Sequence, residues 1–289
     1  MIARVSIALL WLLHFLPLVL LSRIGEAFGM LLYRLARERR EVCLLNLVRC
    51  FPALGRDEII ALARRHFCAL GRSVLERGLL WWSSRERITR LVRIRGREHL
   101  ERELGRPLIL LAPHFVALDA GWTRLCCEWD LSSMYANQKN PIFNRRLFDG
   151  RTRFGRQRLF SRQQGVRPAL AALKEGRPFY YLPDQDYGPR DAVFLPFFGV
   201  PAATVTGMTR LARLSGARIV PCVTRMLPGG AGYELVCHPA WDDYPTDDIE
   251  ADTLRMNAFI ESCARAMPEQ YFWTHKRFKT RPPGEAKWD

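Results

Sequence analysis

An alternation of short apolar runs and helical segments, beginning near residue 91, limits the possible folds more than any other feature. The apolar runs cover residues 91–94, 107–112, 131–135, 178–182, 217–223 and 233–237. Helical periodicity occurs near 97–104, 117–128, 166–175, 203–215 and 249–267. Strands that alternate with helices predict an α/β domain with a central, mostly parallel or mixed sheet flanked by helices. In such folds ligands bind at the carboxyl ends of the strands.

One of these strand ends carries a histidine, in "LILLAPHFVALDAGW" (108–122). His114 lies at the predicted junction of a strand and a helix, and Asp119 follows five residues later. Positions five apart on an ideal helix point about 140° away from each other. At a strand-to-helix turn, however, the histidine can fold back so that Asp119 accepts a hydrogen bond from one ring nitrogen. The other nitrogen would then be able to take a proton from an alcohol.

A structural role for His114 at a helix start is the alternative. The spacing alone does not decide, because "HPAWDD" (238–243) places Asp243 five residues after His238 in a loop context.

A second strand end carries two acids, in "RPFYYLPDQDYGPR" (177–190). Asp184 and Asp186 stand one residue apart in a loop bounded by proline and glycine. Such a pair is able to chelate a divalent metal beside a nucleotide-sugar, as in many glycosyltransferases. It is equally able to bind substrate hydroxyls, to pair with basic side chains, or simply to form a turn.

The charge balance points to an anionic partner. The formal net charge is +15, and residues 144–167, between the strand end with His114 and the one with Asp184 and Asp186, are rich in arginine. A solvated basic face, a site for phosphate or for an acidic carrier, and a nucleic-acid site all fit this composition. No RNP, helix-turn-helix or zinc-finger pattern occurs, so we do not expect nucleic acid as a partner.

The N-terminus predicts attachment to a membrane. "VSIALLWLLHFLPLVLL" (5–21) carries no formal charge and lies between Arg4 and Arg23. Its length is close to the minimum for a membrane span, although His14 and Pro17 leave a helix lying in the membrane interface as an alternative. We therefore expect a membrane anchor at 1–22 and a single α/β domain at 23–289.

The eight cysteines indicate a reducing compartment. They include no CxxC pair and follow no zinc-ligand or disulfide spacing. We expect free, mostly buried thiols and a domain on the cytoplasmic side of the membrane.

Four segments together resemble a known family. "HFVALD", "PDQDYG", "FFGVPAAT" (197–204) and "QYFWTHKRFKTRP" (270–282) occur in the order and approximate spacing of the lipid A biosynthesis acyltransferases of Gram-negative bacteria. These are the late acyltransferases of the lauroyl/myristoyl type, within the lysophospholipid and glycerophosphate acyltransferase superfamily. The resemblance covers nearly the whole chain and includes "NLVRCFP" (46–52). It implies a glycerophosphate-acyltransferase-like fold.

The resemblance implies a general-base mechanism. His114 would deprotonate a hydroxyl of the lipid acceptor, which then attacks the thioester of an acyl carrier protein or of coenzyme A without a covalent acyl-enzyme. Asp119 would be its charge partner, at a position where many family members have glutamate. Arg151, or failing that Arg153, would offset charge on the tetrahedral oxyanion or bind phosphate.

The remaining motif residues match substrate-binding positions. The resemblance implies structural and substrate-orienting roles for Asp184 and Asp186, with no metal. Thr204, Lys276 and Arg277 are weaker candidates for contacts to a phosphorylated headgroup.

The sequence thus predicts a membrane-anchored O-acyltransferase of lipopolysaccharide biosynthesis. Its expected partners are acyl carrier protein, a phosphorylated lipid A precursor and inner-membrane lipids, with no cofactor and with the catalytic domain on the cytoplasmic face of the inner membrane. Three alternatives remain. The first is another acceptor, such as a lysophospholipid or an amino-acid lipid. The second is a metal-dependent glycosyltransferase using Asp184 and Asp186, and the third is a non-catalytic protein that binds membrane surfaces.

Overall fold

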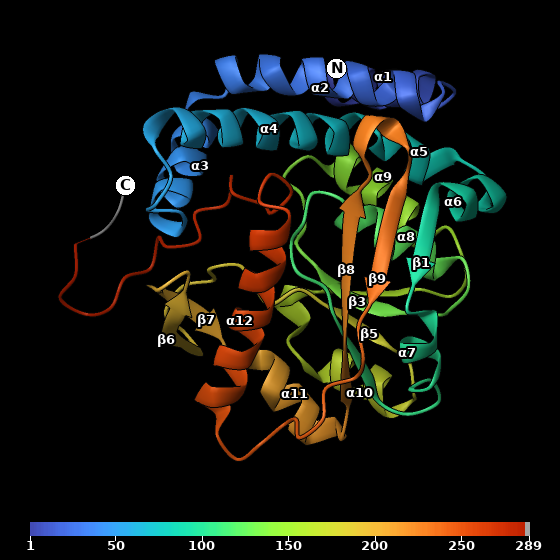
Figure 1. The fold of residues 1–289 in the computed structure, drawn as a ribbon. Coiled ribbons are helices and arrows are strands. Elements are labelled where there is room, and N and C mark those ends of the chain that lie inside the picture. Colours follow the sequence, from blue (N-terminus) through green and yellow to red (C-terminus); the bar gives the residue numbers. More distant parts are fainter. Residues whose placement is uncertain (287–289) are drawn as a thin grey trace.

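The computed structural model describes residues 1–286, which are built around a seven-stranded sheet (Figure 1). In spatial order the strands are β1 (Val92–Arg95), β9 (Tyr233–Cys237), β8 (Arg218–Met226), β2 (Leu108–Leu111), β5 (Phe179–Tyr181), β3 (Ser132–Tyr135) and β4 (Arg158–Ser161). The strands from β8 to β4 run parallel, whereas β9 is antiparallel to β8 because a short hairpin turn joins them. The predicted α/β fold with a mostly parallel sheet is confirmed.

Helices cover both faces of this sheet, which explains the continuous apolar runs. They are α7 (Arg97–Glu101) and α8 (Leu118–Cys126) on one face, and α10 (Arg167–Lys174), α11 (Gly207–Ser215) and α12 (Ile249–Ala266) on the other. Successive side chains of β2 alternate between the two layers. Ile109 and Leu111 belong to the core cluster of α10, α11 and α12, and Leu108 and Leu110 to that of α7 and α8.

Two parts of the β structure were not predicted. β4 lies at the edge of the sheet and is only partly buried, so it lacks the apolar run of a central strand. A separate hairpin consists of β6 (Ala192–Phe197) and β7 (Val200–Val205), and each of its strands contains a proline, which argues against a strand in sequence. β7 also takes up the first residues of the helix predicted at 203–215, so α11 begins only at Gly207.

The apolar N-terminal stretch does not form the membrane helix that the sequence predicts. It breaks at Pro17 into α1 (Ile2–Leu13) and α2 (Leu18–Leu35), because proline has no N–H to donate and its ring clashes with the preceding turn. No helix within residues 1–286 has both the length and the apolar character to cross a bilayer.

α2 packs directly on the rest of the molecule. It runs along α4 (Arg56–Leu75), where a Cβ atom at Gly29 would lie 2.1 Å from the carbonyl oxygen of Phe67. The Ser22 hydroxyl also donates to the buried Glu76 carboxylate, 2.8 Å away. The predicted boundary between residues 22 and 23 therefore falls inside a helix that is fitted closely to the α/β domain.

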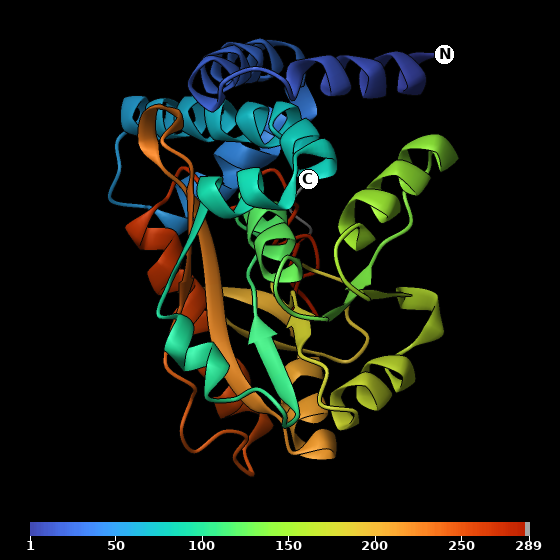
Figure 2. The same ribbon diagram turned by 90° about the vertical axis from the view of Figure 1, so that its right-hand side faces the viewer.

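The N-terminal helices and the carboxyl ends of the parallel strands lie at the same end of the molecule. In Figure 1, β8 points toward α4, with α1 and α2 beyond it, and β2 and β5 run parallel to β8. The segment after β2 packs there too, because Val116 shares a core cluster with Leu10 and Leu18. Figure 2 shows the same layering from the side, with α1 extending along this end. The remaining helices are α3 (Arg37–Cys50), α5 (Arg77–Trp82), α6 (Arg85–Leu91) and α9 (Pro141–Thr152).

His66 anchors the C-terminal segment to α4 and makes stability depend on pH. Its ring is fully buried, and Nδ1 bonds to the carbonyl oxygen of Glu269 at 3.0 Å. Burial lowers the pKa of His66 to about 4. The unfolded chain therefore binds a proton below about pH 6.5 that the folded protein does not bind until about pH 4, so stability present above pH 6.5 is lost as the pH falls.

We expect His66→Asn to remove this dependence. The loss of unfolding free energy between pH 7 and pH 4, measured by urea unfolding, should be smaller than in the wild type by about 3 kcal/mol. His99→Asn, at a partly exposed histidine of α7, is the matched control and should leave the wild-type slope. Identical slopes for wild type and His66→Asn would contradict the assignment.

Candidate active site

Two neighbouring strands end in the same way at the carboxyl edge of the sheet. Leu111 of β2 is in register with Tyr181 of β5. Each strand continues through a proline to a polar residue three positions on, which is His114 after β2 and Asp184 after β5. Because the strands are parallel and adjacent, the two side chains emerge side by side.

His114 and Asp184 form a two-point contact. The Nδ1 atom of His114 lies 2.7 Å from Oδ1 of Asp184, and its backbone N–H donates to Oδ2 at 2.9 Å. Burial by itself raises the pKa of Asp184, but the His114 ring and the backbone N–H outweigh it and hold the pKa below its usual value. An ionised Asp184 accepts a hydrogen bond from Nδ1–H, so Nε2 of the neutral ring keeps a lone pair, which is the arrangement of a general base.

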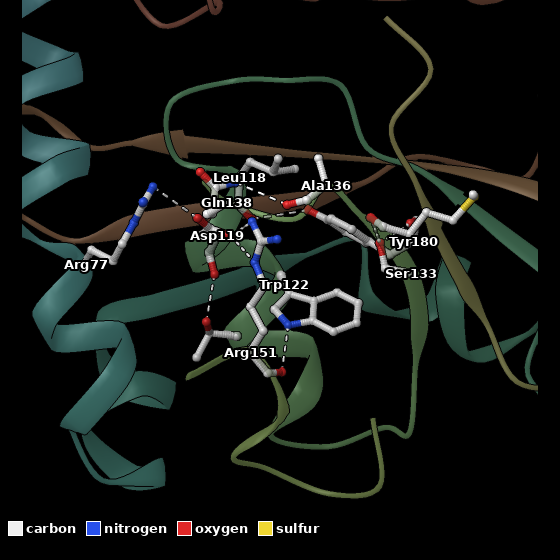
Figure 3. A network of polar contacts seen from close by, with 11 residues as sticks. Arg77, Leu118, Asp119, Trp122, Ser133, Ala136, Gln138, Arg151 and Tyr180 are labelled. Atoms are coloured by element: carbon white, nitrogen blue, oxygen red, sulfur yellow. Dashed lines mark hydrogen bonds and ion pairs between the residues drawn. The ribbon is translucent and has the colours of Figure 1, made fainter. Parts of the chain in front are cut away.

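The predicted hydrogen bond between His114 and Asp119 is replaced by this contact. Asp119 lies in the first turn of α8, and its carboxylate accepts from Nε and Nη2 of Arg151 at 3.0 and 2.6 Å (Figure 3). Arg77 lies on its other side, with Nη2 3.3 Å from Oδ2. Burial alone raises the pKa of Asp119, but the two arginines, with a smaller effect of His114, hold it below its usual value. Asp119 is thus the anion between two cations, and its part in catalysis stays a prediction.

The two candidate arginines differ in their surroundings. Arg151, on α9, contacts Asp119 and remains partly exposed. Arg153 donates instead to the carbonyl oxygens of Trp81 and Ser83 at the end of α5. Arg153 therefore ties α9 to α5, and Arg151 is the better placed of the two for a substrate.

Asp186 joins the acidic loop to the C-terminal segment. Its carboxylate accepts from the backbone N–H and the hydroxyl of Thr280, both at 2.8 Å, and from the N–H of Gly188 at 2.9 Å. Its own backbone N–H donates to Nε2 of His275 at 3.0 Å. The carboxylates of Asp184 and Asp186 are therefore directed at different protein donors and do not converge on a common point.

The weaker candidates also have protein partners. Thr204 is fully buried, and its hydroxyl accepts from Nη2 of Arg277 at 2.9 Å. Arg277, 2% exposed, also donates to the carbonyl oxygen of Ala203 at 2.8 Å. Lys276 is exposed and lies 3.5 Å from Glu38. Of the three, only Lys276 presents its charge at the surface, and direct headgroup contacts stay a prediction.

A pocket next to His114 contains residues to which the sequence assigned no role. It is lined by Asn46, His114, Asp184, Gln185, Tyr271, Phe272, Trp273, His275 and Arg277. The amide of Asn46 donates to the carbonyl oxygens of Trp273 and His275, both at 2.8 Å, and so fixes the C-terminal segment. Asn46 and His275 both lie within the segments that carry the family resemblance, which was the available signal.

Comparison with known proteins decides the family. Residues 1–280 match the family described as bacterial lipid A biosynthesis acyltransferase. The chain belongs to this family. The resemblance found in the sequence is thereby confirmed, and the protein is an acyltransferase.

Curated relatives of this acyltransferase align over nearly its whole length. It is 36% identical over 282 residues to the lipid A biosynthesis lauroyltransferase of Escherichia coli K12, covering 96% of this chain and 92% of that protein. It is 31% identical over 284 residues to the palmitoleoyltransferase of the same organism, covering 97% and 92%. A solved structure, the 1-acyl-sn-glycerophosphate acyltransferase PlsC of Thermotoga maritima, is 17% identical, covers 87% of this chain and 96% of that chain, and gives a TM-score of 0.41.

Proposed function

We propose that this acyltransferase moves a fatty acyl chain from acyl carrier protein to a hydroxyl of a phosphorylated lipid A precursor. The observation that carries the proposal is the His114–Asp184 contact, which leaves Nε2 of His114 available as a base. Membership of the family and the names of the relatives support the acceptor class.

The chemistry follows from this contact. Nε2 of His114 takes the proton of the acceptor hydroxyl as its oxygen attacks the thioester carbonyl carbon, and Asp184 stabilises the imidazolium that forms. The tetrahedral intermediate then expels the thiolate, which takes the proton from Nε2. An ester replaces the thioester, the thiol is released and His114 returns to its starting state. No covalent acyl-enzyme is required.

Asp119 acts in this scheme through Arg151. Oδ1 of the carboxylate accepts from two nitrogens of the Arg151 guanidinium, and Oδ2 lies 3.3 Å from Nη2 of Arg77 on α5. The three side chains tie α5, α8 and α9 together beside His114. Arg151 would then present a fixed cation to a phosphate of the acceptor or to the developing oxyanion.

The charge of the protein suits both substrates. A formal net charge of +15 attracts an acidic acyl carrier protein and a phosphorylated lipid at an anionic surface.

We further propose that α1 and α2 lie flat on the cytoplasmic face of the inner membrane. Ile2, Val5, Leu9 and Leu12 follow helical spacing on α1 and are all exposed. α2 adds a row of its own, with Leu20, Ile24, Leu31 and Leu35 exposed. An exposed apolar surface of this kind suits an interfacial helix pair, and it lies at the same end of the molecule as the strand ends.

Binding to vesicles tests this orientation. We expect Leu12→Glu to lower the fraction that floats with vesicles of phosphatidylethanolamine and phosphatidylglycerol, on the order of tenfold, because it places a charge at the acyl-chain boundary. Leu214→Glu on α11 is the matched control, since Leu214 is 61% exposed against 59% for Leu12. Flotation that is lowered equally by both changes, or by neither, would contradict the proposed surface.

An acyl-transfer assay tests the activity. The purified protein in detergent receives lauroyl-acyl carrier protein with either a phosphorylated lipid A precursor or a lysophospholipid, and ester formation is followed. We expect ester formation on the lipid A precursor. Ester formation on the lysophospholipid alone would show that the acceptor is a lysophospholipid. Faster transfer from lauroyl-coenzyme A than from lauroyl-acyl carrier protein would show that the acyl donor is acyl-coenzyme A.

A further inference from the structure

A second histidine shares the pocket of His114. His275 lies in the C-terminal segment and lines the same pocket as His114 and Asp184. Its backbone is fixed on both sides, because its N–H donates to the carbonyl oxygen of Phe272 at 3.2 Å and its own carbonyl oxygen accepts from the Asn46 amide at 2.8 Å. The backbone that carries the ring is therefore fixed by a local turn and by a residue of α3.

The hydrogen bond at Nε2 determines where the ring proton lies. The backbone N–H of Asp186 can only donate, so Nε2 of His275 must accept, and in the neutral ring the proton is on Nδ1. The Asp186 N–H is itself fixed, since the carboxylate of that residue binds Thr280 in the same segment.

The ring is also kept neutral. Burial, assisted by the charges of His114, Arg277 and Lys279 and opposed by Asp184, lowers the pKa of His275 to about 4. At neutral pH the side chain is therefore an uncharged N–H donor. This differs from His114, whose Nδ1 is directed at a carboxylate.

His275 lines the pocket, and its Nδ1 atom is not sealed from solvent. Within residues 1–286 the Nδ1 atom has no hydrogen-bond partner. It also differs from Nε2 of His66, which has no partner and is sealed from solvent. Arg277, which also lines the pocket, donates to Thr204 and to the carbonyl oxygen of Ala203. The pocket thus offers a fixed, uncharged donor beside the base.

We propose that His275 donates its Nδ1–H to the carbonyl oxygen of the acyl thioester as negative charge develops there. This inference rests on the proposed acyl transfer. The proton stays on Nδ1 throughout, and the hydrogen bond strengthens as the carbonyl oxygen becomes an oxyanion and relaxes when the thiolate leaves. A donor fixed before the reaction favours the transition state over the bound thioester.

Two substitutions separate this function from a structural one. His275→Gln places a carboxamide oxygen near the position of Nε2, where it accepts the Asp186 N–H, but leaves no donor at Nδ1. His275→Asn places an amide N–H2 near the position of Nδ1 but leaves the Asp186 N–H without an acceptor. A purely structural histidine is replaced better by glutamine, whereas an oxyanion donor is replaced better by asparagine.

We expect the substitutions to change kcat and to leave KM nearly unchanged. His275→Gln should lower kcat by about 10²- to 10³-fold with little change in KM for the acyl donor and an unchanged circular dichroism spectrum, and His275→Asn should be the more active of the two. A kcat for His275→Gln within about threefold of the wild type, or one no lower than that of His275→Asn, overturns the inference. If the wild-type protein transfers no acyl chain, the proposed function itself is contradicted, and this outcome is distinct from a failure of the inference about His275.

Discussion

Replacing His114 with alanine is expected to lower kcat for acyl transfer by about 10²- to 10⁴-fold. The substitution removes the group that takes the hydroxyl proton, while the surfaces that bind the two substrates remain, so both KM values should change little. The measurement is the initial rate of transfer from lauroyl-acyl carrier protein to a phosphorylated lipid A precursor in detergent.

His238→Ala is the matched control for this experiment. His238 begins the second match to the same five-residue spacing, but it follows β9 and packs edge-on against Phe259 of α12. We expect it to keep near-wild-type activity. Full activity of His114→Ala would remove the base from the mechanism, and an equal loss in both variants would point to a general loss of structure.

The sequence predicted the sheet well because the central strands are buried on both sides. A run such as "LILL" has no polar position, and the structure buries all four residues completely. The edge strand β4 lacks this signal and was missed. The strands of the hairpin β6–β7 are apolar, but each contains a proline, and they were missed for that reason. At the N-terminus, composition indicated a membrane anchor, but the chain breaks at Pro17 into two helices, of which α1 packs on α5 and α9 and α2 runs along α4.

The partner of His114 was beyond the reach of spacing along the chain. The contact with Asp184 depends on β2 and β5 being neighbours in the sheet, and strand order is a property of the whole fold. A local signal does exist, since both strands end in a proline followed by the polar residue. Asp119, by contrast, was assigned from its spacing and from the family resemblance, and two arginines from α5 and α9 contact its carboxylate.

The second large effect is expected from Asp184→Asn, which we predict to lower kcat by about 10³- to 10⁴-fold, as for the corresponding substitution in the serine-protease triad. Both oxygens of Asp184 accept from His114, one from the backbone N–H and one from Nδ1. A carboxamide has a single acceptor oxygen, and the backbone N–H, which can only donate, takes it. The amide N–H2 then faces Nδ1, so the ring proton moves to Nε2 and the lone pair of the base is lost.

Nitrogen-15 NMR of histidine-labelled protein measures this tautomer change directly. Asp119→Asn is the informative comparison. It removes the negative charge of a carboxylate that contacts Arg151 and Arg77 and not the ring of His114. It should leave the tautomer of His114 unchanged and lower the unfolding free energy by about 2 to 3 kcal/mol, since two partly buried cations lose their anion. Combining it with Arg151→Gln should cost less stability than the sum of the single changes. If instead Asp119→Asn moves the ring proton and Asp184→Asn does not, Asp119 is the partner of the ring and Asp184 only fixes the loop.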